Sequence, residues 1–163
     1  YGITAFGLAQ RMDISNKEAR QLIDDYFHTF PKVHQYMEQA KDSTREKGYA
    51  ETMFGRRRYL PDIKSGNNTV RGFAERNAIN APIQGSEADI IKIAMIRIWR
   101  RFKAEGLRSK MILQVHDELN FSVYPDEEKK VEEIVMQEMQ NAANLNVPLT
   151  ADSGWGDNWL EAH

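Results

Sequence analysis

Apolar positions in the first third of the chain recur at helical spacing. Between residues 15 and 30 they share one helix face, and Ser15 with Glu18 has the pattern of a capping box. Pro31 ends this helix and suits the first turn of a second one, which we expect to end near Gly48. The two apolar faces are Ala19, Leu22, Ile23, Tyr26, Phe27 and Phe30, and then Val33, Tyr36, Met37 and Ala40.

The middle of the chain changes from alternating to helical periodicity. Residues 49–61 predict two short strands around a turn at Gly55, and a polar loop follows at 64–69. Helical spacing resumes from about 70 to 105, and Pro82 predicts a kink or break just before it. The second arm of this helix is expected to bury Ile91, Ala94, Met95, Ile98 and Phe102.

A second hairpin is predicted over residues 110–124. Asp126 is a candidate cap for the helix that follows, and a final strand is expected at about 148–153. This order of elements indicates an α+β fold, in which an antiparallel sheet packs against several helices. In the second strand of the hairpin, Leu119, Phe121 and Val123 alternate with Asn120, Ser122 and Tyr124.

Composition adds only broad limits. The 163 residues, 41% hydrophobic and 28% charged, suffice for one globular domain with a core. We find no apolar run of membrane-span length and no signal-peptide pattern, and without cysteine there are no disulfides. A net charge of −2 does not favour nucleic acid, so any such surface must arise from local clustering. Because the chain starts with Tyr1-Gly2 rather than Met, we expect a piece of a longer protein.

Three titratable residues, His116, Asp117 and Glu118, lie at the predicted turn between two core strands. One interpretation is a polar hairpin loop. A second is a cation site, because Mg²⁺ is commonly held by one or two carboxylates together with substrate phosphates. A third, a Ser-His-Asp hydrolase, is disfavoured because the chain has no G-x-S-x-G motif. Zinc is also disfavoured, because no zinc-binding spacing links His28, His34, His116 and His163.

A second group of polar residues lies in the long predicted helix. Arg76, Asn80 and Gln84 follow each other at intervals of four, which places them in one stripe. The stripe is either a solvated face or a surface for nucleic acid, since such side chains suit base edges, sugars and phosphates. The same alternatives hold for a nearby basic cluster, Arg56, Arg57, Arg58, Lys64 and Arg71.

Several motifs occur in an order that resembles the family A DNA polymerases, the bacterial DNA polymerase I type. QVHDEL follows an apolar strand, and AERNAINAPIQGSEADIIK precedes it by about 25 residues. YGITAFGLA at the start, YAETMFGRRRYLPDI in the middle and NVPLTADSGWGDNWLEAH at the end extend the resemblance over essentially the whole chain.

The resemblance implies a role for each site residue. Asp117 and Glu118 are the candidate catalytic and metal-binding residues, the second in a supporting role, and two Mg²⁺ ions serve the complete enzyme. His116 approaches the primer strand near its terminus, and Tyr1 lies by the templating base. Primer–template DNA is contacted, partly through the minor groove, by Arg76, Asn80 and Gln84.

The resemblance also implies the reaction, which is DNA-directed DNA synthesis from dNTPs in replication or repair, by two-metal nucleotidyl transfer in the bacterial cytoplasm. Residues 1–64 resemble the distal fingers and 65–163 the palm. No segment resembles the strand with the second metal-binding aspartate, so we expect the isolated chain to be inactive. We also expect it to self-associate through an exposed palm strand edge. Alternatives are a non-catalytic primer–template-binding module and a related single-subunit RNA polymerase.

Overall fold

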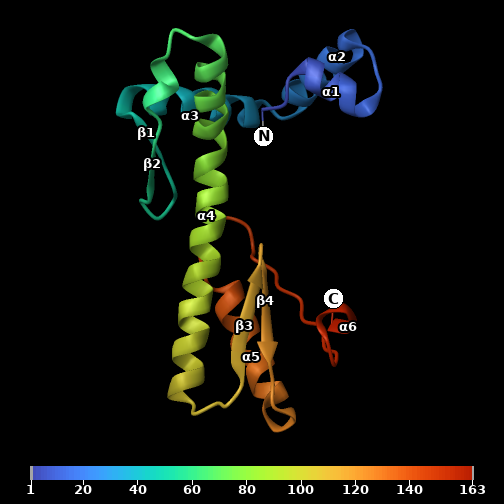
Figure 1. Cartoon of the computed structure of the whole chain (residues 1–163), viewed down its shortest axis with the longest axis vertical. Coiled ribbons are helices and arrows are strands. Elements are labelled where there is room, and N and C mark those ends of the chain that lie inside the picture. Colours follow the sequence, from blue (N-terminus) through green and yellow to red (C-terminus); the bar gives the residue numbers. More distant parts are fainter. Residues whose placement is uncertain (1, 163) are drawn as a thin grey trace. The chain divides into compact units, whose positions relative to one another are not determined.

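The chain divides into two units, residues 1–86 and 87–163, and each is described by itself. The computed structural model describes residues 2–162 (Figure 1). The predicted α+β class is confirmed, with helices and two separate two-stranded antiparallel sheets. The elements are α1 (Ala5–Met12), α2 (Asn16–Thr29), α3 (Pro31–Lys47), β1 (Tyr49–Glu51), β2 (Arg57–Tyr59), η1 (Pro61–Lys64), α4 (Asn68–Ala104), β3 (Lys110–Val115), β4 (Glu118–Ser122), η2 (Pro125–Glu127), α5 (Glu128–Gln140) and α6 (Trp159–Ala162).

The predicted signals that begin and end the early helices are confirmed. At the start of α2 the Glu18 backbone N–H donates to Ser15 Oγ at 3.2 Å, and the Ser15 N–H donates to the Glu18 carboxylate at 3.0 Å. Pro31 opens α3, and Gly48, with a φ of 80°, ends it. The apolar face of α2 is less buried than its pattern predicts, since large parts of Leu22, Tyr26 and Phe30 are exposed.

The β1–β2 hairpin turns at Gly55, which has a φ of 84°, and its tip contacts α4. The Met53 N–H donates to Ser86 Oγ at 2.9 Å, and Arg56 Nη2 donates to the Gly85 carbonyl at 2.9 Å. These bonds attach the hairpin tip to one short stretch of the helix. The hairpin, η1 and α4 together bury Ala50, Leu60, Ile63, Ala74 and Ala78.

Helix α4 is continuous through Pro82, so the predicted break is wrong (Figure 1). Proline removes one backbone donor and crowds the carbonyls of the preceding turn. Side-chain hydroxyls bond to carbonyls around it: Tyr36 Oη donates to the Ile79 carbonyl at 3.0 Å, and Ser86 Oγ donates to the Pro82 carbonyl. The hydroxyls thus give extra hydrogen bonds to helix carbonyls close to the proline.

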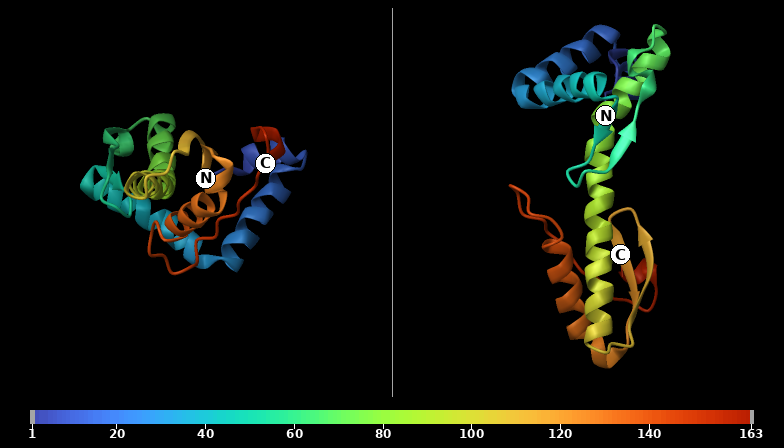
Figure 2. Two further views of the ribbon diagram at one scale, coloured as in Figure 1. Left: turned by 90° about the horizontal axis from the view of Figure 1, so that it is seen from below. Right: turned by 90° about the vertical axis from the view of Figure 1, so that its left-hand side faces the viewer.

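In the second unit, α4, α5 and the β3–β4 hairpin pack around one core (Figure 2). The predicted hairpin is confirmed, and its register runs from Lys110 opposite Ser122 to Val115 opposite Glu118. Its inward residues Leu119, Phe121 and Val123 pack against the core, as their alternation predicts. The core consists of Ala94, Ile98, Phe102, Val131, Ile134 and Ala142.

Two sequence predictions in this unit are wrong. Asp126 does not cap α5, because its carboxylate pairs with the Arg108 guanidinium. Residues 148–153 form no strand, and in the described part of the chain β3 and β4 pair only with each other. Ser153 Oγ instead donates to the Glu132 carboxylate of α5.

The Glu127 carboxylate joins the start of α5 to the start of β3. It accepts hydrogen bonds from the backbone N–H groups of Arg108, at 3.0 Å, and Ser109, at 2.9 Å, and from Ser109 Oγ at 2.6 Å. These donors favour the charged form and lower the pKa of Glu127 from 4.5 to about 2. The carboxylate therefore connects the two segments most strongly while it is ionised.

Acid is expected to weaken this connection. A lowered folded-state pKa contributes stability that is complete above the unfolded pKa of 4.5 and is lost as the pH falls toward about 2. We predict that the free energy of unfolding decreases as the pH falls through this window. Glu127→Gln should make the free energy of unfolding less dependent on pH there. Urea unfolding at a series of pH values measures it, with the exposed Glu133→Gln as control. An identical pH dependence in Glu127→Gln and the wild type would contradict the prediction.

Candidate metal and nucleic-acid site

The β3–β4 turn presents the three predicted residues at the end of a rigid hairpin. Val115 pairs with Glu118, so His116 and Asp117 alone form the turn. His116 has a φ of 53°, a left-handed conformation that a two-residue turn requires and that non-glycine residues adopt uncommonly. Gln114 Nε2 donates to the His116 carbonyl at 2.8 Å and braces the turn from β3.

The two acids of the turn have different surroundings. Asp117 is exposed, whereas Glu118 begins β4 and is half-buried. Trp159 Nε1, in the C-terminal segment, donates to Glu118 Oε1 at 2.7 Å. The sequence analysis missed Trp159, because no local pattern indicates a contact between residues 41 positions apart.

The turn fits part of a magnesium site. Mg²⁺ keeps several waters and is commonly bound by one or two carboxylates with substrate phosphates, so Asp117 and Glu118 are suitable oxygen donors. Within residues 2–162, no group of three or more His, Asp or Glu side chains could hold a metal ion. The described residues therefore supply two neighbouring carboxylates and not a complete set of ligands.

The polar stripe lies on one helix face in the first unit. Because α4 is continuous, Arg76, Asn80 and Gln84 succeed each other along one side of it over roughly 12 Å. Arg76 and Gln84 are exposed and Asn80 is half-buried. The Arg76 side chain passes close to Gly2, where an added Cβ would lie 3.4 Å from Arg76 Cγ. Tyr1, the remaining predicted DNA contact, lies outside the described residues.

The predicted basic cluster is partly used within the fold. Arg57 pairs with Glu51 at 2.9 Å and lies over the Tyr49 ring, and Arg71 donates to the Ser65 carbonyl at 2.9 Å. Together with the bond from Arg56 to α4, these contacts give three of the five cations a structural role. Arg58 and Lys64 are exposed.

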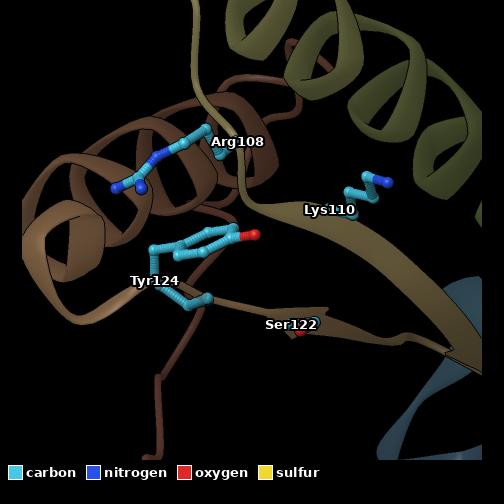
Figure 3. Close-up of a pocket in the computed structure, with 5 residues that line it drawn as sticks. Arg108, Lys110, Ser122 and Tyr124 are labelled. Atoms are coloured by element: carbon cyan, nitrogen blue, oxygen red, sulfur yellow. The ribbon is translucent and has the colours of Figure 1, made fainter.

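A surface pocket lies at the opposite end of the second hairpin from the turn (Figure 3). Its lining includes Arg108, whose guanidinium lies 4.2 Å above the centre of the Tyr124 ring. Arg108 also pairs with Asp126 and Glu127, so its charge is already neutralised. The pocket contains none of the predicted site residues, and it is lined by Arg108, Lys110, Ser122, Val123 and Tyr124.

The chain is similar along nearly its whole length to proteins named DNA polymerase I. Residues 1–161 match DNA polymerase family A. The chain is 51% identical over 162 residues to DNA polymerase I of Streptococcus pneumoniae, and 48% identical over 161 residues to DNA polymerase I of Caldicellulosiruptor bescii. Each alignment covers 99% of this chain but only 18% and 19% of those proteins.

A solved structure shares the fold. The POL domain of Pol1 from M. smegmatis, in complex with DNA primer-template and dNTP, matches with a TM-score of 0.97 and 49% identity over 99% of this chain and 29% of that one. The fold and the motifs thus match one segment of these longer polymerases. The chain belongs to DNA polymerase family A. No helix in residues 2–162 is both long and apolar enough to cross a membrane.

Proposed function

We propose that this chain carries part of the active site of a DNA-directed DNA polymerase that acts in replication or repair. In the reaction the primer 3′ oxygen attacks the α-phosphorus of a dNTP, a new O–P bond forms, and the bond to pyrophosphate breaks. The observation that carries the proposal is the hairpin turn with two neighbouring carboxylates in a family A chain. The M. smegmatis relative, solved with primer-template and dNTP, supports the same substrates.

The proposed metal ligands are Asp117 and Glu118. When bound, two divalent cations would activate the 3′ hydroxyl and neutralise the triphosphate. We infer that these cations are Mg²⁺. A second ligand-bearing strand is expected elsewhere in the polymerase, so inactivity of the isolated chain stays a prediction. Asp117 is proposed to hold the ions, Glu118 to support it, and His116 to approach the primer terminus.

The proposed DNA contacts are Arg76, Asn80 and Gln84, with Tyr1 beside the templating base. Hydrogen-bond acceptors in the minor groove are almost the same for every correct base pair, so such contacts can sense pair geometry without reading sequence. Assignment of about 1–64 to the fingers and 65–163 to the palm stays a prediction. A bacterial cytoplasmic location is inferred from the same family membership.

Self-association through a strand edge also stays a prediction. In the described part of the chain, β3 and β4 pair only with each other, which leaves each strand with one edge that could pair with another chain.

The DNA contacts can be tested by primer–template binding. We predict that Arg76→Ala weakens binding by about 1–3 kcal/mol, because an exposed guanidinium on the proposed DNA face is removed. Fluorescence anisotropy of a labelled primer–template at several salt concentrations measures the loss, and circular dichroism checks folding. A contact to phosphate would also lower the salt slope by about one, whereas a contact to a base edge would not.

Arg100→Ala is the matched control, because Arg100 is exposed on the same helix and lies outside the stripe. Equal binding by both variants would mean that the stripe is a solvated face. Normal DNA binding without primer extension by the full-length wild-type protein would instead indicate the non-catalytic binding module.

A further inference from the structure

The C-terminal segment, residues 153–162, reaches the hairpin turn through a hydrogen bond from Trp159. Trp159 Nε1 donates to Glu118 Oε1 at 2.7 Å. An indole N–H can only donate, and a bond to an ionised carboxylate is stronger than one between neutral groups. The contact therefore restrains one oxygen of the acid that directly follows Asp117.

Residues 153–162 form a folded strap. Glu161 closes the turn at the start of α6, because its carboxylate accepts from Asn158 Nδ2 at 2.7 Å and from the Asp157 N–H at 3.2 Å. The chain returns so closely that an added Cβ at Gly154 would overlap the Ala162 carbonyl, and one at Gly156 would lie 2.6 Å from Glu161 Cβ. These contacts deliver Trp159 to Glu118 from an organised segment.

The strap does not use its large side chains to build a core. Trp159 is 51% exposed, Trp155 46% and Leu160 87%. A tryptophan kept for packing alone would bury most of its ring, since the main contribution of that side chain to stability is buried area. The hydrogen bond to Glu118 is thus a feature of Trp159 that packing does not explain.

We propose that Trp159 is a positioning residue for Glu118, whose carboxylate it holds in the orientation that supports a divalent cation beside Asp117. This inference rests on the proposed polymerase function. Side chains that hydrogen-bond to metal-binding groups orient them, and their replacement commonly weakens metal affinity or activity about 10–100-fold. Trp159 lies outside the hairpin and donates such a hydrogen bond to Glu118.

The test uses the full-length protein labelled with 5-fluorotryptophan. Trp159→Phe removes the donor, keeps an aromatic ring and identifies the Trp159 fluorine resonance. With Mg²⁺ as the probe and primer–template bound, we expect this resonance to shift on titration and to differ in Glu118→Gln. We also expect Trp159→Phe to raise the Mg²⁺ concentration for half-maximal primer extension about tenfold.

A double-mutant comparison separates positioning from general stability. Trp159→Phe should have little further effect on the Mg²⁺ requirement in a Glu118→Gln background, because the restrained group is already changed. Trp155→Phe, in the same strap and similarly exposed, is the matched control and should leave the Mg²⁺ requirement unchanged. An equal loss from Trp159→Phe in both backgrounds, or the same Trp159 resonance with Glu and Gln at position 118, would overturn the proposal.

The two proposals fail in different ways. If Asp117→Asn extends primers normally, the polymerase site is misplaced, and the positioning role toward a cation is overturned with it. If Asp117→Asn is inactive but the Trp159 resonance shifts neither with Mg²⁺ nor with the substitution at residue 118, only the positioning role is overturned.

Discussion

Asp117→Ala in the full-length protein is expected to lower the rate of primer extension by roughly 10³-fold or more, while primer–template binding stays within about twofold. Asp117 is exposed at the tip of a two-residue turn and pairs with no strand neighbour, so its removal leaves the hairpin register and the core intact. The loss then falls on the chemical step and not on folding. Single-turnover extension with saturating dNTP measures the rate, and anisotropy measures DNA binding.

Two further variants sharpen this prediction. Asp117→Asn keeps the shape and removes the charge, and it should be nearly as slow as Asp117→Ala if cation binding is the role of this residue. Asp24→Asn, an exposed aspartate on α2, is the matched control and should extend primers at the wild-type rate. Normal extension by Asp117→Asn would refute the site assignment.

Gly85→Ala is expected to destabilise the first unit by about 1–3 kcal/mol, although alanine is the better helix former. An added Cβ would lie 2.6 Å from Thr52 Cγ2. Thr52 cannot easily rotate away, because it is buried and its Oγ1 accepts hydrogen bonds from the backbone N–H groups of Phe54 and Arg56. The substitution therefore pushes the hairpin tip off α4.

The control and the rescue for this prediction lie in the same unit. Gly72→Ala, also in α4, meets nothing closer than Arg76 Nη1 at 3.8 Å and should stabilise the chain by up to about 1 kcal/mol. Thr52→Ser deletes the clashing methyl and keeps the hydroxyl, so it should recover most of the loss in the Gly85→Ala background. Thermal unfolding of these three variants and the wild type measures the changes. A stabilising Gly85→Ala would show that the hairpin tip does not pack against the helix.

Sequence reasoning succeeded where the determining contacts are local. The Ser15–Glu18 capping box spans four residues, and the β3–β4 hairpin follows from alternation on either side of a two-residue turn. Both patterns depend on neighbours within one element, which the sequence displays directly.

The wrong predictions concern features that depend on contacts between residues far apart in the sequence. Helix α4 continues through Pro82 beside a hydroxyl from Tyr36, 43 positions before the carbonyl that it contacts. Asp126 turns to Arg108 instead of capping α5, and residues 148–153 have no strand partner in the described part of the chain. Trp159 was missed for the same reason. The motifs predicted the polar stripe and the acidic turn. The contacts that support these residues are visible only in the folded structure.

The backbone conformation of His116 lowers the stability of the turn. A left-handed φ costs a residue with a side chain of the order of 1–2 kcal/mol that glycine would not incur. A turn optimised only for folding would carry glycine or asparagine here. If His116 approaches the primer terminus as proposed, the imidazole gives activity at the cost of a less stable backbone, an exchange known from functional sites.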